Sequence, residues 1–186
     1  MESVLDRVIK QNTENVNLLK TKDYNIFSVL QIQSKEVLIC RMIADLLNTR
    51  GQHGAGAEYL KIFLRDCLGM EKMDTKLADQ AIVTAEYAID DERRIDIVIE
   101  IGSYFLPIEV KIYAADQKSQ CFDYYQYAKR RDAQAKVYYL TLDGHRPGKD
   151  STSSGSQSVP EEDIVCLSFR EHILNWLKAC KSCENT

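Results

Sequence analysis

The chain has 186 residues, of which 45% are hydrophobic and 28% are charged, a composition that predicts one globular domain and argues against wholesale disorder. Its 24 Lys and Arg residues against 28 Asp and Glu residues leave a formal net charge of −4. This charge excludes a strongly basic nucleic-acid binder, but it does not exclude a local basic patch.

Targeting and redox signals are few. No apolar run approaches the roughly 18 residues that a membrane span needs, and the acidic start Met-Glu-Ser-Val-Leu-Asp differs from the basic start of a secretory signal peptide. The six cysteines lack the spacing of a disulfide framework, so we expect a protein of the reducing cytoplasm without a membrane partner. The lone Cys180-x-x-Cys183 pair is a weak signal for zinc or redox chemistry, because no second pair accompanies it.

The first third of the chain has the periodicity of helices, and we expect a helical N-terminal part over residues 1–70. Glycines at 51–54 end the first helical run, and a second helix is predicted over 57–68. The first run is marked by apolar residues at three- and four-residue spacing: Val29, Ile32, Ile39, Ile43 and Leu47.

The pattern then changes to the two-residue period of β-strands. Three such runs are predicted over 81–89, 94–101 and 104–112, the last two separated by Gly102-Ser103. A helix is predicted over 116–131, with Asp116 as its N-cap.

The remaining elements complete a single α/β domain. Short strands are predicted over 136–142 and 164–168, followed by a terminal helix over 169–180, so the C-terminal strand and helix span about 164–183. The intervening segment 144–163 is rich in Ser, Gly and Pro, and we expect a mobile loop there. The element order predicts a mixed sheet of about five strands flanked by helices, with a core over about 81–142.

The turn Gly102-Ser103 determines which side chains of the hairpin share a face, because glycine readily adopts positive φ in a two-residue loop. With this loop, the numbers of facing residues sum to 205, and a slip of one residue would bury four charges. One face then carries Ile95, Ile97, Ile99, Ile101, Tyr104, Leu106, Ile108, Val110 and Ile112. The opposite face carries Arg94, Asp96, Val98, Glu100, Phe105, Pro107, Glu109 and Lys111.

In this register Asp96 lies opposite Glu109, with the Cβ atoms about 4.5–5.5 Å apart. Two carboxylates at that distance repel unless a positive charge lies between them, and Mg²⁺, with oxygen bonds of about 2.1 Å, fits the gap. Lys111 projects from the same face and Arg94 faces it across the hairpin, an arrangement that suits metal-assisted attack on a phosphodiester. The alternative is a solvated face on which these charges merely neutralise one another.

Glu36 lies on the apolar stripe of the first helical run, where a carboxylate is costly unless it is paired or bound to a metal. Two interpretations are open: an acid at the edge of the stripe that reaches water, or an acid that arrives over the sheet beside Asp96. Glu86, in the preceding strand, could belong to either face, because the loop over 90–93 does not determine its register.

The helix over 116–131 presents Gln120 and Tyr124 at i and i+4, with Gln117 and Tyr127 extending the same face. Amide and phenol groups there could bind a water molecule or a phosphate, and the alternative is an ordinary amphipathic helix.

These segments resemble the PD-(D/E)XK nuclease superfamily, through Arg94-Ile-Asp-Ile-Val-Ile-Glu100, Ile108-Glu-Val-Lys-Ile-Tyr-Ala-Ala-Asp-Gln117 and Gln120-x-x-x-Tyr124. The chain is similar to the bacterial branch with an N-terminal helical Glu, a His-Gly-x-Gly turn at 53–56 and a Phe-Leu run at 63–64. The resemblance spans roughly residues 30–178.

The resemblance implies the restriction-endonuclease-like fold and a set of site residues. It implies that Asp96 and Glu109 bind Mg²⁺, with Mn²⁺ as a substitute, and that the Val110 backbone carbonyl is a third ligand. It further implies that Lys111 lies at the nucleophilic water, that Glu36 is the helical acid and that Gln120 is the helical polar partner. The departures are Ile95 in place of the name-giving proline, Val110 in place of a frequent Asn, and Ile39-Cys40 in place of a frequent His-Ser.

Our first hypothesis is therefore a Mg²⁺-dependent nuclease that acts on DNA, and the second is a catalytically silent nuclease-fold module that binds nucleic acid or a protein partner. The residues do not separate DNA from RNA or an endonuclease from an exonuclease, and they leave oligomeric state open, a homodimer included. Tyr124, Arg94 and Lys118 are the predicted substrate contacts. Further candidates for contact with the nucleic-acid backbone are Lys129, Arg130, Arg131 and Lys136.

Overall fold

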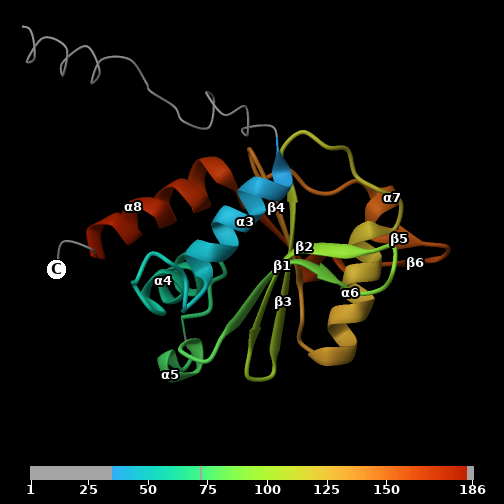
Figure 1. Cartoon of the computed structure of the whole chain (residues 1–186). Coiled ribbons are helices and arrows are strands. Elements are labelled where there is room, and N and C mark those ends of the chain that lie inside the picture. The colour runs from blue at the N-terminus through green and yellow to red at the C-terminus, as the bar shows by residue number, and fades with distance from the viewer. Residues whose placement is uncertain (1–34, 72, 184–186) are drawn as a thin grey trace, which may run out of the picture. The chain divides into compact units, whose positions relative to one another are not determined.

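The computed structural model describes residues 35–71 and 73–183, and a mixed five-stranded sheet of order β1-β2-β3-β4-β7 lies at its centre (Figure 1). The first three strands pair antiparallel, whereas β3 with β4 and β4 with β7 pair parallel. The expected restriction-endonuclease-like α/β fold is thereby confirmed. The strands are β1 (Ile82–Ala88), β2 (Arg94–Ile101), β3 (Tyr104–Lys111), β4 (Val137–Thr141) and β7 (Ile164–Ser168).

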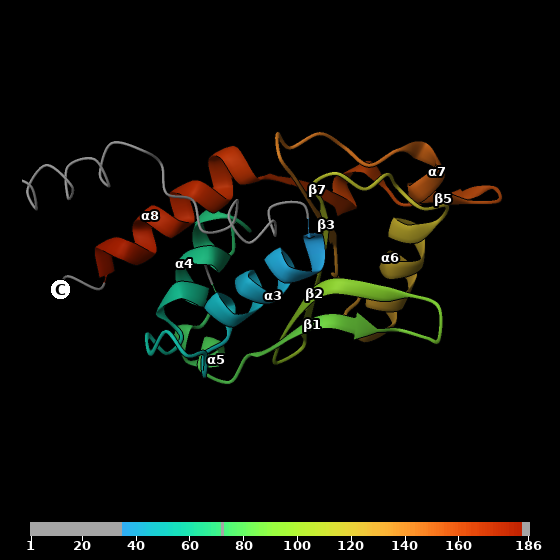
Figure 2. The same ribbon diagram turned by 45° about the horizontal axis from the view of Figure 1, so that its top comes forward.

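Helices cover both faces of this sheet (Figure 2). On one face lie α3, α4 and α8, and on the other lies α6. The helices are α3 (Glu36–Leu47), α4 (Glu58–Asp66), α5 (Thr75–Ala78), α6 (Gln120–Arg131), α7 (Lys149–Thr152) and α8 (Leu174–Cys183), the last preceded by a π-helical turn over Phe169–Ile173.

The larger hydrophobic core lies between the sheet and α3, α4 and α8. It contains the hairpin residues that the register assigned to one face, from Ile97 and Ile99 on β2 to Ile108 and Val110 on β3. Trp176 of α8 is 1% exposed; its indole N–H donates to the Tyr59 carbonyl at 2.8 Å. Because these residues come from both ends of the chain, the core ties the hairpin to the helices.

The predicted hairpin register is confirmed from Ile101–Tyr104 to Ile97–Ile108, whose numbers sum to 205. Beyond this point the prediction is wrong: the backbone ladder ends, Arg94 does not pair with Lys111, and Ile95 packs on the α6 side instead of the isoleucine face. At this position the Asp96 side chain, rather than the β2 backbone, accepts the next N–H of β3, that of Val110.

The opposite face of the hairpin is not solvated as one alternative proposed. A second cluster under α6 buries Val98 and Phe105 together with Tyr124 and Ala128 of the helix. Tyr87 and Tyr127 pack against the edge of this cluster. The charged side chains of this face therefore lie beside a packed helix.

Two predictions between β3 and β7 are corrected. Helix α6 begins at Gln120, and Ser119, with φ of +55°, occupies the N-cap position predicted for Asp116. The segment 144–163, predicted to be a loop, contains α7, the two-stranded ribbon β5 (Ser153–Ser154) and β6 (Gln157–Ser158), and a 3₁₀ turn over Glu161–Asp163. Ser151 of α7 is fully buried, and its hydroxyl accepts the Cys121 N–H at 3.3 Å. The mobility of this segment stays a prediction.

Two further expectations concern the ends of the chain and its thiols. The predicted helical residues Val29 and Ile32 lie outside the described residues. Within the described ranges, no helix is long and apolar enough to cross a membrane. The six cysteines, all within the described ranges, form no disulfide.

We expect Trp176→Ala to lower the free energy of unfolding by about 3–5 kcal/mol, because it removes a buried indole and leaves a cavity against Phe63. Urea unfolding followed by circular dichroism measures this change. Asn175→Ala, an exposed position on the same helix, is the control and should change stability by no more than about 0.5 kcal/mol. Equal losses in the two variants would contradict the central place of Trp176 in the core.

Candidate active site

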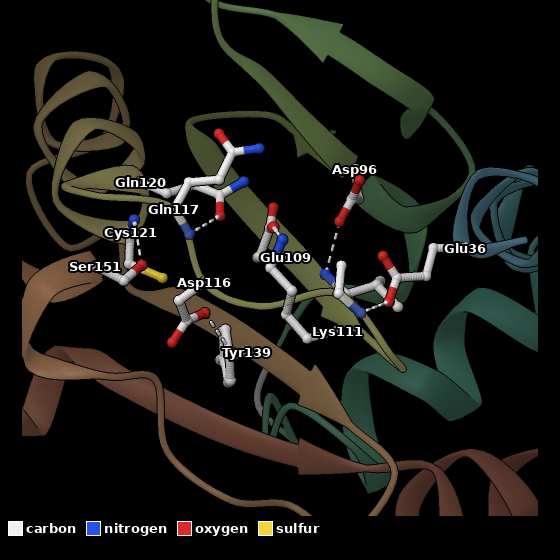
Figure 3. Close-up of polar contacts among 12 residues, drawn as sticks. Glu36, Asp96, Glu109, Lys111, Asp116, Gln117, Gln120, Cys121, Tyr139 and Ser151 are labelled. Carbon is white, nitrogen blue, oxygen red and sulfur yellow. Dashed lines mark hydrogen bonds and ion pairs between the residues drawn. The ribbon is translucent and has the colours of Figure 1, made fainter. Parts of the chain in front are cut away.

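Four elements bring the predicted site residues to the C-terminal end of β3 (Figure 3). Glu109 and Lys111 lie at the end of β3, on the face opposite to Ile108 and Val110. Asp96 extends toward them from β2. Glu36 is the first residue of α3 and Gln120 the first of α6, so helix ends approach the site from both faces of the sheet.

The Asp96 side chain takes the place of a backbone carbonyl as the acceptor for an N–H group of β3. Its Oδ2 accepts the Val110 N–H at 2.8 Å, at the position where the hairpin ladder has ended. Burial raises the pKa of Asp96, and this effect outweighs the Val110 N–H and the Lys111 ammonium, which favour the carboxylate. Asp96 is thus held in position by its own strand partner.

Glu109 is a buried acid with little compensation. It is 1% exposed, and its Oε1 forms an ion pair with Lys111 Nζ at 2.6 Å. Apart from this ion pair, neither of its oxygens has a hydrogen-bond partner among the described residues. Burial, followed by the charge of Asp96, raises the pKa of Glu109 well above its usual range, although Lys111 opposes this. A further positive charge beside Glu109 would therefore be strongly favoured.

Lys111 is buried among the carboxylates, at 8% exposure. Burial lowers the pKa of its ammonium, but the charges of Glu109, Asp96 and Glu36 outweigh this effect and the pKa lies above its usual value. Lys111 therefore carries a positive charge at neutral pH, close to both predicted metal ligands.

Glu36 binds the backbone that follows β3. Its Oε1 accepts the N–H groups of Ile112, Tyr113 and Ala114 at 2.6, 2.8 and 3.0 Å. Burial alone would raise the pKa of Glu36, but these three hydrogen bonds and Lys111 outweigh it, so the pKa lies below its usual value. The interpretation of Glu36 as an acid that only reaches water is wrong, because its carboxylate reaches the end of β3.

Gln120 and Tyr124 form a hydrogen-bonded chain that anchors α6. The Gln120 amide donates to the Tyr124 hydroxyl at 3.0 Å, and this hydroxyl donates to the Arg94 carbonyl at 2.5 Å. Tyr124 is 1% exposed, and burial raises the pKa of its phenol. The hydroxyl proton of Tyr124 is thus used inside the protein, and the contact of Tyr124 with a substrate stays a prediction.

The basic residues predicted to contact nucleic acid differ in whether they already bind other side chains of the protein. The side chains of Arg94 and Lys118 are exposed, and neither forms an ion pair in the described part of the chain. Lys129 instead binds Asp163 at 3.1 Å, and Arg131 binds Glu100 at 2.9 Å. Arg130 lies over the Tyr127 ring, and Lys136 is exposed.

Sequence reasoning missed a role of Asp116 away from its predicted cap. Its Oδ1 accepts the Tyr139 hydroxyl at 2.6 Å, and its Oδ2 accepts the Gly148 N–H at 2.6 Å. Tyr139 pairs with Glu109 across β3 and β4, so Asp116 connects the segment after Lys111 to the strand beside the site. No short-range signal could have found this contact, because it depends on the parallel pairing of distant strands.

Glu86 and Cys40 also lie at the site. Glu86 adopts φ of +54° opposite Asp96, and its carboxylate pairs with Arg41 of α3 at 2.5 Å. Glu86 therefore joins the face of the sheet that α3 covers. Cys40, four residues after Glu36, is fully buried. Burial, with Asp96 and Glu109, raises the pKa of its thiol, so the residue in place of the frequent serine is protonated and inert.

The donor set for a metal is small. Among the described residues, no group of three or more His, Cys, Asp or Glu side chains is arranged to hold a metal ion. Two carboxylates plus a backbone carbonyl are nevertheless the set that Mg²⁺ accepts, since it retains several waters. The Glu109 carboxylate, whose one described partner is Lys111, fits such a cation.

Comparison with family sequence models gives a match over most of the chain. The sequence model of the PD-(D/E)XK nuclease superfamily matches residues 24–185. No curated protein and no solved structure matches the chain.

We expect Glu36→Gln to lower the free energy of unfolding at pH 7 by about 1–3 kcal/mol, because a neutral amide accepts the three N–H groups less strongly. The folded pKa of Glu36 lies below the ordinary value of 4.5, so its stabilisation is complete above about pH 4.5 and is lost as the pH falls through the folded pKa. The difference between wild type and variant should therefore shrink from pH 7 to pH 3.

Urea unfolding at both pH values measures this difference. Glu92→Gln, which removes an exposed acid from the loop after β1, is the matched control and should show neither effect. A Glu36→Gln deficit of the same size at pH 3 and pH 7 would mean that its charge does not stabilise the fold.

Proposed function

The chain belongs to the PD-(D/E)XK nuclease superfamily, and on this premise we propose that it is a metal-dependent nuclease that hydrolyses phosphodiester bonds in DNA, with Mg²⁺ as its cofactor. Members of this superfamily are generally nucleases that use divalent metals. The observation that carries the proposal is the buried Glu109 carboxylate, which lies beside Asp96 and has only the Lys111 ammonium as a partner among the described residues. A merely structural acid at this depth would be expected to have further partners.

Asp96 and Glu109 are the residues that would hold the cation. The Val110 carbonyl is the third proposed ligand: in an extended strand, the N–H and C=O groups of one residue point to the same edge. The Val110 N–H points to Asp96, and β2 no longer pairs with β3 there. A bound divalent cation would supply a polarised water and would neutralise charge that develops on the phosphate.

Lys111 has a distinct task in this proposal. Its buried ammonium is held in place by the ion pair with Glu109. A cation that is already fixed and desolvated stabilises a developing oxyanion without further reorganisation. Lys111 therefore orients the attacking water and stabilises the phosphate, while the two acids hold the cofactor.

Glu36 and Gln120 act as positioning residues. Glu36 fixes the backbone immediately after Lys111, and Gln120 connects α6 to the first residue of β2 through Tyr124. Neither residue needs to touch the substrate to affect the geometry of Asp96 and Lys111.

The direct test is incubation of the purified protein with linear, circular and single-stranded DNA in the presence of Mg²⁺, Mn²⁺ or EDTA. We expect cleavage with either metal and none with EDTA. Cleavage of circular DNA would indicate an endonuclease, whereas cleavage of linear DNA alone would indicate an exonuclease. Absence of cleavage of all three DNA substrates with both Mg²⁺ and Mn²⁺ would overturn the proposed DNA nuclease and favour a silent binding module.

We expect Asp96→Asn and Glu109→Gln each to abolish binding of Mn²⁺ while the protein stays folded. Both changes keep the shape of the side chain but remove its charge, and the amide oxygen introduced by Asp96→Asn can still accept the Val110 N–H. Calorimetric titration measures the metal affinity, with Asp143→Asn as a control for an exposed carboxylate just beyond the end of β4. Wild-type affinity in both site variants would remove these residues from the metal site.

We expect Lys111→Ala to lower the cleavage rate by a factor of about 10² to 10³ and to leave metal affinity unchanged, because Lys111 is a charge beside the reaction and not a ligand. Lys111→Arg should not restore the rate, since a planar guanidinium cannot occupy the buried place of a compact ammonium. If the protein were only a binding module, Lys111→Ala would instead lower the salt dependence of binding by about one phosphate contact.

A further inference from the structure

Tyr113 is an exposed aromatic residue at the rim of the candidate site. It is 66% exposed, the highest value among the large hydrophobic side chains of the described residues. It follows Lys111 by two positions, and its ring makes no aromatic or cation–π contact within the described part of the chain. The two residues that follow it, Ala114 and Ala115, are also exposed and too small to pack against the ring.

The backbone that carries this ring is nevertheless firmly held. The Tyr113 N–H donates to Glu36 Oε1 at 2.8 Å, between the hydrogen bonds of Ile112 and Ala114 to the same atom. A carboxylate that binds three successive N–H groups removes the freedom that an exposed loop residue normally keeps. Little ordering entropy would then be lost when a ligand packs on the ring.

The distance from Lys111 suits one nucleotide. Two residues of chain span at most about 7 Å, so a phosphate beside the Lys111 ammonium places an adjoining base within reach of the Tyr113 ring. Aromatic side chains bind bases by stacking, whichever base is present. In a continuous duplex the bases already stack on one another and are not free to do so.

We propose that Tyr113 stacks on an unpaired base next to the scissile phosphate, so that the protein favours single-stranded or frayed DNA over a continuous duplex. This inference rests on the proposed nuclease function for the nature of the ligand. It uses a side chain that neither the metal site nor the core requires.

The test measures stacking without turnover. Single-stranded oligonucleotides that contain 2-aminopurine are titrated with protein in EDTA at low salt, and base stacking is followed as quenching of the fluorescence. We expect Tyr113→Ala to weaken binding about 5- to 140-fold, which corresponds to the loss of about 1–3 kcal/mol per stacked base. Tyr113→Phe should keep both affinity and quenching, because the ring and not the hydroxyl stacks.

Tyr104→Ala is the matched control. Tyr104 is 38% exposed and begins β3, about 23 Å along the strand from Lys111, so its removal should change neither binding nor quenching. A blunt duplex of the same sequence should bind wild type and Tyr113→Ala alike.

The outcomes separate this proposal from the proposed function. Equal binding of the single strand by wild type and Tyr113→Ala, or no binding by wild type, overturns the role of Tyr113 even if the protein cleaves DNA with Mg²⁺. Quenching that depends on Tyr113 in a protein that cleaves nothing supports the role of Tyr113 and overturns the nuclease function instead.

Discussion

Between β2 and β3 the backbone hydrogen bonds give way to one that a side chain accepts, and the candidate site begins at that point. From Ile101 to Ile97 the two strands are joined by their backbones, and at the next position the Asp96 carboxylate accepts the Val110 N–H in place of a backbone carbonyl. Because the side chain takes over the pairing, the backbone ladder can end here without leaving the Val110 N–H unsatisfied. Glu109 and Lys111, in this space at the end of the ladder, are among the last residues of β3.

The charges in this space are balanced only in part. One buried ammonium, that of Lys111, lies among three carboxylates, and two of these have raised pKa values because of their burial. Glu36 differs, since backbone N–H groups outweigh the burial that opposes its charge. The protein thus keeps one acid charged to hold the backbone and leaves two in need of a cation, which separates a structural task from a chemical one.

Much of this arrangement could be predicted from the residues. The turn Gly102-Ser103 and the alternation of isoleucines with charged residues determine the hairpin register, and i, i+4 spacing places Gln120 beside Tyr124. The end of the ladder at Asp96 could not be predicted, because a side chain competes there with the backbone for one N–H. The contact of Asp116 with Tyr139 could not be predicted for another reason: it depends on the parallel pairing of β4 with β3. Local patterns describe pairs of neighbouring strands well and describe contacts between distant segments poorly.

The bond between Glu36 and the end of β3 also has a kinetic consequence. Glu36 lies 76 residues before Ile112 in the chain, so no local search can bring the two together. The hairpin closes a two-residue loop and can form early, whereas the contact of α3 must await the closure of a much longer loop. We therefore expect a folding order in which the carboxylates of the hairpin meet first, and the backbone after Lys111 becomes ordered only when α3 docks. Assembly of the candidate site would then be complete only when the whole fold is complete.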